Sequence, residues 1–376
     1  MSVNDKFVSN TTTAKPKVHF QFIDGLRGIA AFWVLLFHTD PDGRISQLTS
    51  ALPTLLVDVL FRLGSRGVAI FFVLSGFVMA YSLRNAKIDL NYFKNFLIRR
   101  FVRLSPPYYA SILIALAFAF VASVAKGVAF EPMGQPLSFQ RFFAHLFYVQ
   151  DIFKLVHIDD VYWTLCLEVQ FYLVFFFLLS LVKWLDFSLE LSWSRAAVFV
   201  PATLLAALYP VGAFAVDGRP TIIFPFLYSF FLGVFAYWTW RENLKSLWFY
   251  LYCGVLLTAG IINSSGFAIT SVIVAILILE VARANRMQDW LNWGWLQFLG
   301  KISYSLYLNH VSIIGATYFL GYKLLGRNIW SEFVCLLLGI STSIAFATLM
   351  WNLVEKPSMK WTKNIKIVNS SKAVGT

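Results

Sequence analysis

An arginine and a histidine stand eleven residues apart in the first long hydrophobic segment of this chain, in the stretch RGIAAFWVLLFH. In an α-helix, eleven residues make three turns plus about 20°, so Arg27 and His38 share one face, about 16 Å apart along the axis. Asp24 precedes Arg27 by three residues and lies on the same side. Ionisable groups in a membrane segment indicate function by default. The alternative is structural: an Asp24–Arg27 ion pair at the interface and a water-exposed His38.

The functional alternative for this face is a polar track that carries a cation at one end and a titratable base at the other. A histidine near neutral pH can take a proton from a hydroxyl group. An arginine can stabilise a developing oxyanion or hold an anionic reagent. Such a track would suit a reagent that enters from one side of a membrane and reacts deeper in.

Other polar side chains interrupt later apolar stretches. Glu168 lies inside YWTLCLEVQFY (162–172), and burial of a lone carboxylate requires a partner or a water-filled cavity. Ser75 and Gly76 stand in the middle of FFVLSGFVMAYS, where a small pair either allows close helix packing or leaves room for a ligand. Arg100 and Arg103 are i, i+3 neighbours in RRFVRLSPPYY and can grip one polyanion together, although arginines there also anchor a helix at the cytoplasmic interface.

Two C-terminal stretches carry further candidates. GKISYSLYLNH (300–310) gives a helix with a polar face of Ser303, Tyr307 and His310. Tyr and Ser often join membrane helices, so His310 is the more informative of the three. Glu355 in NLVEKP is most simply an exposed helix cap. HIDD (157–160) has metal-ligand residue types, but its simplest interpretation is a solvated loop, and we expect no metal site.

The composition indicates an integral membrane protein. Of the 376 residues, 59% are hydrophobic and 13% charged, against roughly 45–50% and about 25% in soluble domains. The net charge of +12 fits cytoplasmic loops and lipid head groups, because no basic groove or nucleic-acid motif accompanies it. The three cysteines lie in apolar stretches and are expected to be buried free thiols.

Ten segments are apolar enough, and near enough to the roughly 20 residues required, to predict transmembrane helices. They are 21–38, 66–82, 103–125, 161–182, 196–215, 221–240, 247–263, 267–282, 296–320 and 330–354. With the N-terminus inside, 20 Lys and Arg residues fall on inside segments and 9 on outside segments. This bias predicts cytoplasmic N- and C-termini.

The connecting regions complete the predicted all-α fold. Phe139, Phe142, Phe143, Leu146 and Phe153 recur at helical spacing in the loop 126–160, which predicts an amphipathic helix on the membrane surface. The N-terminal residues 1–19 show no signal-peptide pattern, and we expect flexible cytoplasmic tails at 1–19 and 358–376.

Taken in order, these motifs make the chain resemble the acyltransferase 3 family of membrane-bound O-acyltransferases. The resemblance covers residues 20–357, predicted as one transmembrane domain. Its motifs are FIDGLRGIAAFWVLLFH, FFVLSGFV, RRFVRLSPPYY, WTLCLEVQFYL, GKISYSLYLNH and the late EKP. Family members move an acyl group, often acetyl, from cytoplasmic acyl-CoA to a hydroxyl on a glycan or small molecule.

The resemblance implies a role for each candidate. His38 becomes the catalytic histidine, with Arg27 as its partner and Glu168 as an acid of the site. Arg100 and Arg103 become contacts of the acyl-CoA phosphates, and Ser75 and Tyr307 line the same donor site. Asp24 and His310 are assigned supporting roles. A hydrogen bond from the ring N–H of His38 to Glu168 or Asp24 would orient the imidazole and make it more basic.

The expected function is therefore transfer of an acyl group, which the family resemblance implies is acetyl, to an envelope glycan or lipid-linked saccharide at the bacterial inner (cytoplasmic) membrane. Acetyl-CoA or another acyl-CoA is the donor substrate, no cofactor is held permanently, and the partners are the hydroxyl acceptor and the bilayer. One alternative is a small-molecule O-acyltransferase that modifies an antibiotic or glycolipid. Another is a transporter or flippase in which Arg27, Glu168 and His310 line the path.

Overall fold

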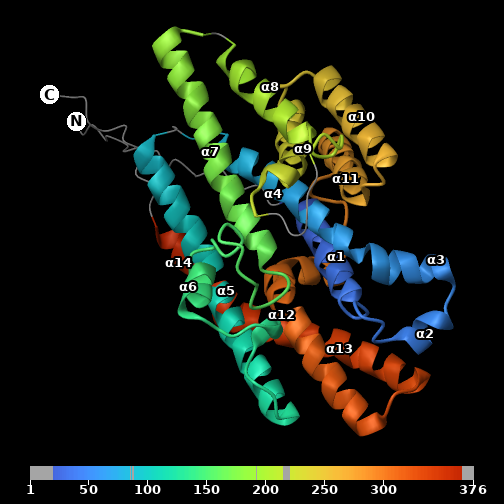
Figure 1. Ribbon diagram of the computed structural model, residues 1–376. Coiled ribbons are helices and arrows are strands. Elements are labelled where there is room, and N and C mark those ends of the chain that lie inside the picture. The colour runs from blue at the N-terminus through green and yellow to red at the C-terminus, as the bar shows by residue number, and fades with distance from the viewer. Residues whose placement is uncertain (1–19, 85, 87–88, 192, 215–220, 366–376) are drawn as a thin grey trace, which may run out of the picture.

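The computed structural model describes residues 20–84, 86, 89–191, 193–214 and 221–365. Within these residues the regular structure is entirely helical, as predicted. Figure 1 shows long helices in a bundle, with α12 and α13 as one hairpin and α8 to α11 as a separate group. The predicted N-terminal tail, 1–19, lies outside the described residues.

The helices follow the chain in this order. The first half contains α1 (Gln21–Phe37), α2 (Ser46–Ser50), α3 (Thr54–Val57), the π-turn η1 (Asp58–Arg62), the 3₁₀ turn η2 (Leu63–Arg66), α4 (Gly67–Leu83), α5 (Leu90–Lys126), η3 (Pro132–Gly134), α6 (Phe139–Leu146) and α7 (Trp163–Leu189). The second half contains α8 (Ser194–Ala207), α9 (Phe224–Trp240), α10 (Ser246–Ile262), α11 (Gly266–Arg283), α12 (Gly294–Leu325), α13 (Ile329–Met350), the π-turn η4 (Trp351–Glu355) and α14 (Lys356–Asn364).

Each of the ten predicted apolar segments contains or overlaps a helix: α1, α4, α5, and α7 to α13. Helix α8 ends at Ala207, short of the predicted end at 215, a position outside the described residues. Five helical stretches in the described part of the chain are long and apolar enough to cross a membrane: Thr54–Leu83, Asn91–Lys126, Trp163–Leu189, Gly266–Arg283 and Ile329–Asn364. The regular structure of the described residues is thus all-helical, with five candidate membrane-spanning helices. Ten crossings and cytoplasmic termini stay predictions.

Helix α5 begins at Leu90, well before the predicted start at 103. Its 37 residues span about 55 Å, against roughly 30 Å for a bilayer core, so its arginine-rich first third extends beyond one membrane thickness. The helix continues through Pro106 and Pro107. Pro107 has no N–H for the carbonyl of Arg103, and the hydroxyl of Ser358 lies 3.2 Å from that oxygen. The single proton of this hydroxyl is shared with the carbonyl oxygen of Glu355, at 2.7 Å, so α14 compensates the missing backbone donor only in part.

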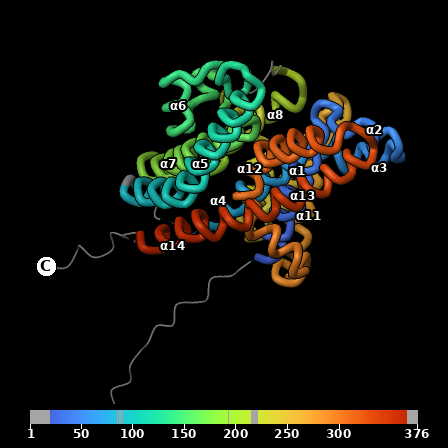
Figure 2. Tube along the Cα trace, turned by 90° about the horizontal axis from the view of Figure 1, so that it is seen from below, coloured from blue at the N-terminus to red at the C-terminus, as the bar shows by residue number. Residues whose placement is uncertain are grey.

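Helix α14 takes in residues 358–364, the first part of the segment predicted as a tail. It packs on α5, as Figure 2 also shows, and Arg99 Nε donates to the carbonyl of Ile365 at 2.8 Å. These contacts order the helix although its composition is polar, which the tail prediction did not take into account. Residues 366–376 lie outside the described residues.

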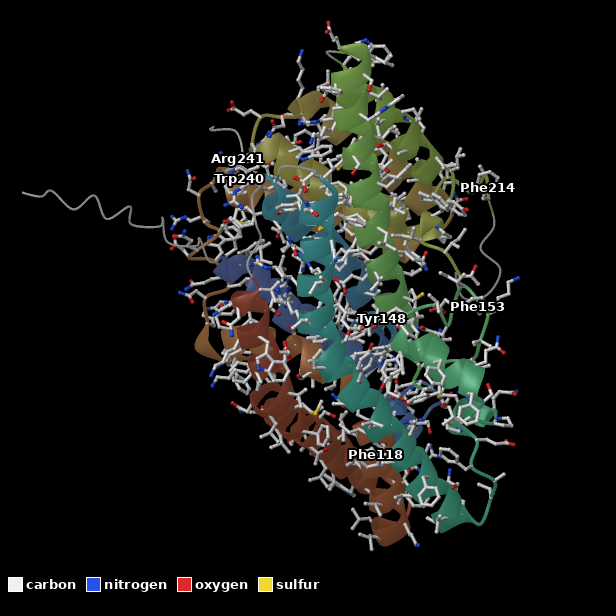
Figure 3. All side chains as sticks on the ribbon, turned by 90° about the vertical axis from the view of Figure 1, so that its left-hand side faces the viewer. Phe118, Tyr148, Phe153, Phe214, Trp240 and Arg241 are labelled. Carbon is white, nitrogen blue, oxygen red and sulfur yellow. The ribbon has the colours of Figure 1, made fainter. Side chains whose placement is uncertain are left out.

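Helix α6 confirms the helix predicted in the loop 126–160, although Phe153 lies beyond its end. Phe139, Phe143 and Phe153 are exposed, and Figure 3 shows Phe153 on this side of the molecule. On the opposite face, Arg141 is buried and donates to five backbone carbonyls of the loop at 2.6–3.3 Å. The helix is therefore amphipathic with its apolar face outward, the arrangement expected at a membrane surface.

Helices α4 and α9 touch at glycines. A Cβ at Gly76 would lie 1.9 Å from the carbonyl oxygen of Phe230, and one at Gly233 would lie 1.9 Å from that of Val73. Neither site leaves room for a side chain, so the packing interpretation holds for Gly76. The contact places α4, and with it Ser75, against the rest of the bundle.

Gly76→Ala should separate α4 from α9 and destabilise the fold. The inserted methyl group meets backbone, which cannot move aside, and overpacking of this kind costs about 1–3 kcal/mol. We expect a clear fall in Tm of the purified protein in detergent.

Gly254→Ala is the matched control, since it also places a methyl group in a helix but meets nothing within 4 Å. Equal Tm values for the two variants would show that the α4–α9 contact is not tight.

Candidate active site

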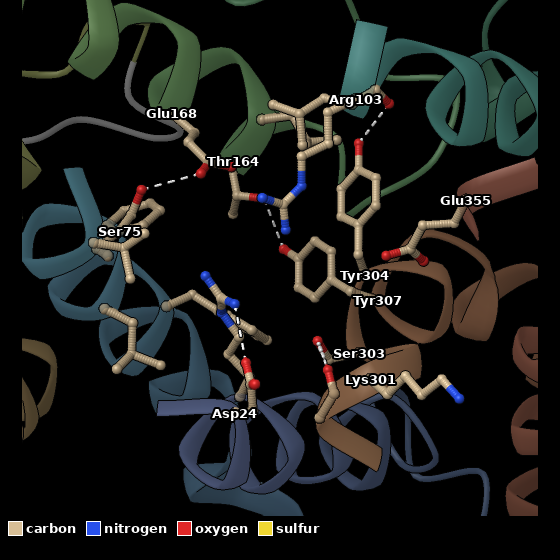
Figure 4. Close-up of a pocket in the computed structure, with 18 of the residues that line it drawn as sticks. Asp24, Ser75, Arg103, Thr164, Glu168, Lys301, Ser303, Tyr304, Tyr307 and Glu355 are labelled. Carbon is tan, nitrogen blue, oxygen red and sulfur yellow. Dashed lines mark hydrogen bonds and ion pairs between the residues drawn. The ribbon is translucent and has the colours of Figure 1, made fainter. Parts of the chain in front are cut away.

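A cavity of about 530 Å³ lies among α1, α4, α5, α7, α12 and the η4–α14 segment. Figure 4 shows Ser75, Arg103, Glu168 and Tyr307 around this space, each from a different helix. Seven of the nine predicted site residues line it: Asp24, Arg27, Ser75, Arg100, Arg103, Glu168 and Tyr307. The two histidines, His38 and His310, are not among the lining residues.

Arg100 and Arg103 bring positive charge to the cavity from α5. The guanidinium of Arg100 lies over the ring of Tyr172, 4.9 Å from its centroid, and also faces Phe96. No ion pair joins either arginine to a carboxylate among the residues the structure describes. Two unpaired guanidinium groups at one cavity form a receptor for a polyanion, because arginine recognises phosphate in a planar, bidentate manner.

Arg27 forms the ion pair expected from its spacing, with Arg27 Nη1 3.3 Å from Asp24 Oδ1. Both residues line the cavity, so the pair borders the site and is not only an interface anchor. Helix α12 approaches α1 closely here, since a Cβ at Gly300 would lie 2.1 Å from the carbonyl oxygen of Asp24. This contact fixes the position of α12 relative to the Arg27 face.

Glu168 joins α7 to α4 across the cavity. Its Oε1 accepts a hydrogen bond from Ser75 Oγ at 3.0 Å and a short one from the hydroxyl of Tyr172. These two donors supply the partners that a carboxylate in an apolar segment requires. Neither Glu168 nor Asp24 is hydrogen-bonded to His38 in the described hydrogen bonds, so the orienting bond suggested by sequence comes from elsewhere.

Several lining residues were missed or misjudged from the sequence. Glu355 is buried at 6% exposure and accepts from the backbone N–H and the hydroxyl of Ser305, so its interpretation as an exposed cap is wrong. The π-turn η4 and the continuing α14 keep it inside. Lys301 lies over Trp351, with Nζ 4.0 Å from the ring centroid, and both line the cavity. The EKP motif was a signal for Glu355, but its burial depends on α14.

Tyr307 of α12 lines the cavity. Its hydroxyl shares a hydrogen bond of 2.9 Å with Thr164, and its ring meets Phe71 edge to face. On its other side the ring centroid of Tyr307 is 5.9 Å from that of His310. Tyr307 therefore lines the cavity and also lies beside His310.

His38 and His310 form a hydrogen-bonded pair. His310 Nδ1 lies 3.1 Å and 2.8 Å from the carbonyl oxygens of Leu306 and Tyr307. Carbonyl oxygens only accept, so Nδ1 of His310 carries the proton and Nε2 of the neutral ring is an acceptor. That Nε2 lies 3.1 Å from His38 Nδ1.

The tautomer of His38 follows from the same network. Its Nδ1 faces two acceptors, Nε2 of His310 and the carbonyl oxygen of Val34 at 2.9 Å. The proton of neutral His38 is therefore assigned to Nδ1, which leaves the lone pair on Nε2. His38 is thus prepared to act as a base at Nε2, and His310 is the residue that orients it.

The loop beside the histidines is buried, not solvated as the HIDD stretch suggested. His157 Nε2 lies 2.5 Å from Asp151 Oδ1, and Asp159 Oδ2 accepts from Ser312 on α12 at 2.8 Å. Both His157 and Asp159 are less than 5% exposed. Across the described residues, no group of three or more His, Cys, Asp or Glu side chains is placed to hold a metal ion. The three cysteines are free and buried, as predicted.

The family model described as an acyltransferase domain, Acyl_transf_3, matches residues 20–351. The chain belongs to the acyltransferase 3 family. This confirms the family resemblance.

Two relatives illustrate what the acyltransferase 3 chain is similar to. The peptidoglycan O-acetyltransferase OatA of Listeria monocytogenes is 25% identical over 394 residues, which cover 93% of this chain and 57% of OatA. A protein of Staphylococcus aureus strain COL, provisionally named an O-acetyltransferase, is 24% identical over 392 residues. These residues cover 92% of this chain and 58% of the Staphylococcus protein. The chain thus spans little more than half the length of these relatives. No solved structure matches it.

Burial raises the pKa of Asp159 to about 6, against 3.8 for the ordinary carboxyl group. The folded state then binds the proton more tightly than the unfolded state, so this contribution to stability is present below pH 4 and is lost as the pH rises through 6. Asp159→Asn keeps an acceptor for Ser312 without the charge. We expect the variant to gain up to about 3 kcal/mol over the parent at pH 8 and to match it near pH 4.

Unfolding measured across pH 4–8 checks this expectation. Asp42→Asn is the control, because Asp42 is exposed at 79% and its loss should leave the pH profile unchanged. A variant that is less stable than the parent at pH 8 would mean that ionised Asp159 is stabilised by its surroundings.

Proposed function

We propose that this protein is a transmembrane O-acyltransferase that moves an acyl group, in the first instance acetyl, from cytoplasmic acyl-CoA to a hydroxyl of an envelope glycan or lipid-linked saccharide. Membership of the acyltransferase 3 family and similarity to O-acetyltransferases support the reaction class. One observation carries the proposal. The cavity carries unpaired arginines, and Tyr307, which lines it, lies beside His310, the hydrogen-bonding partner of His38.

The cavity supports an acyl-CoA donor. Its volume of about 530 Å³ lies in the range of 300–1,000 Å³ that is usual for ligand pockets. Arg100 and Arg103 offer positive charge to the phosphates, and Ser75 and Tyr307 line the inner wall along which the pantetheine arm would lie. The charge pattern of the chain predicts that α5 begins on the cytoplasmic side, where acyl-CoA is found.

The transfer step is assigned to His38. Its Nε2 takes the proton of the acceptor hydroxyl as the hydroxyl oxygen attacks the thioester carbonyl. A C–O bond forms, the C–S bond breaks, and the departing CoA sulfur receives the proton from the histidinium. His310 keeps the base in the reactive tautomer. A route through an acyl-histidine intermediate gives the same net reaction in two steps.

Arg27 is assigned to the donor path. It lies about 16 Å from His38 along α1, which is too far for both residues to act on one carbonyl. Its position in the cavity suits contact with the pantetheine arm or a phosphate, while Glu168 holds the cavity wall through Ser75 and Tyr172. The route from cavity to His38 requires Tyr307 to move or the thioester to pass beside it.

His38→Ala should abolish transfer of the labelled acetyl group from acetyl-CoA, and with it the slow hydrolysis of the thioester, because no other described residue offers the same base. Purified full-length protein is mixed with labelled acetyl-CoA and a saccharide acceptor, and both products are counted. CoA binding by the variant, measured by calorimetry, should equal that of the parent and thus report an intact fold.

Activity that survives His38→Ala would overturn the assignment of the base. A transporter would give a different result, namely movement of substrate across a vesicle membrane with the thioester intact. Mass spectrometry of envelope glycans with and without the gene identifies the acceptor and the acyl group together. A small-molecule acceptor would instead leave the glycans unchanged.

Arg100→Gln combined with Arg103→Gln should weaken acyl-CoA binding by 10-fold or more, since two charge-assisted contacts at about 1.5–3 kcal/mol each are lost. The KM for the acceptor should change little. Steady-state kinetics in both substrates separate the two effects. Lys126→Gln, at the far end of the same helix, is the matched control, and an equal loss in both KM values would contradict the donor assignment.

A further inference from the structure

A second hollow, of about 480 Å³, lies on the other side of the α4–α7 contact and is lined from α4, α7, α8 and α9. Three arginines border it: Arg84 at the end of α4, Arg195 at the start of α8 and Arg241 at the end of α9. Figure 3 shows Arg241 beside Trp240, toward the opposite end of the molecule from Phe118. None of the first cavity's lining residues is shared with this hollow.

Among the residues that the structure describes, the three arginines have no acidic partner. Arg84 donates to the carbonyl oxygen of Tyr81 at 2.7 Å and lies over the ring of that tyrosine. Arg195 and Arg241 face the rings of Trp238 and Trp240, at 5.3 Å and 5.7 Å. Within the described part of the chain, no carboxylate lines the hollow or forms an ion pair with any of the three.

Like charges around one hollow repel each other, and an anion between them would remove the repulsion. The hydroxyl of Tyr237 lies within electrostatic reach of both Arg84 and Arg241, and Asn243 adds an amide to the lining. Guanidinium forks together with neutral hydrogen-bonding groups are the chemistry that recognises phosphate.

The position of the hollow near the ends of α7 and α8 indicates which kind of molecule would carry such a phosphate. The adjoining ends of α7 and α8 carry exposed aromatic residues, Trp184, Phe187 and Trp193, at 56%, 87% and 60%. Exposed Trp at a helix end is typical of the membrane–water interface. The charge pattern assigns this end to the cytoplasmic side, and basic pockets between helices there bind anionic lipid head groups.

We propose that this hollow binds a phosphate group, presented by the head group of an anionic phospholipid of the cytoplasmic leaflet. The site is separate from the donor cavity and does not depend on the proposed acyl transfer. A lipid bound there would contact the ends of α4, α8 and α9. It would therefore stabilise the packing of these helices, including α4, which carries Ser75.

The test measures Tm of the purified full chain in detergent with four probes: dihexanoyl-phosphatidylglycerol, dihexanoyl-phosphatidylcholine, inorganic phosphate and adenosine 3′,5′-bisphosphate. We expect the phosphatidylglycerol to raise Tm by several degrees and the zwitterionic phosphatidylcholine to have little effect. Arg84→Gln combined with Arg241→Gln should remove most of the shift. Arg286→Gln should keep it, because that exposed arginine lies outside the hollow and pairs with Asp289.

The other outcomes distinguish a lipid head group from free phosphate or a nucleotide as the source of the bound phosphate. A shift with inorganic phosphate that phosphatidylglycerol does not exceed would support the anion site and overturn the lipid as its source. A shift with adenosine bisphosphate that is lost in the Arg84/Arg241 variant would overturn the separate site, since the hollow would then hold the donor's nucleotide. The variant with Arg100→Gln and Arg103→Gln should lose the Tm shift with adenosine bisphosphate and keep the shift with phosphatidylglycerol. Failure of the donor assignment is therefore distinguishable from failure of the lipid site.

No dependence on the arginines, or no phosphatidylglycerol shift at all, overturns the proposal. Should the double variant fold poorly, as judged by its Tm without probe, Arg195→Gln alone replaces it. That single change should reduce the apparent affinity for phosphatidylglycerol at least 3-fold.

Discussion

The close packing of α1 against α12 is the contact on which the site depends. Gly300 lets the two helices approach until a side chain would collide with the carbonyl oxygen of Asp24. One end of this helix pair places Arg27 in the cavity, and the other places His310 against His38. A looser contact would leave the imidazole of His38 without its orienting partner. The polar groups are thus positioned by Gly300, a residue that has no side chain.

Much of the fold could be predicted because the sequence signals are local. A run of apolar residues marks each of the ten long segments, and the phenylalanine spacing marks α6. The shared face of Arg27 and His38 follows from helix geometry alone. The basic pair on α5 and the carboxylate of Glu168 stand out because charge is rare in this chain.

The remaining features depend on tertiary contacts that spacing does not reveal. His38 and His310 are 272 residues apart, so their hydrogen bond could not be predicted without knowing that α1 packs on α12. Glu355 was expected to be an exposed cap because it stands at the end of the last predicted helix, yet the chain continues through η4 into α14, which packs on α5, and Glu355 is buried. The HIDD stretch was misjudged for the same reason, since Ser312, 153 residues further along the chain, provides a partner for Asp159.

The Tyr307–Thr164 hydrogen bond also has an electrical consequence. If the cavity opens to the cytoplasm and His38 faces the opposite side, a continuous file of water between them would conduct protons through an imidazole. Such a leak would dissipate the ion gradient of an energised membrane. The phenol ring of Tyr307, packed against Phe71 and hydrogen-bonded to Thr164, lies where it would interrupt that file. Under the proposed mechanism, the side chain beside the thioester's route would therefore also limit proton leakage.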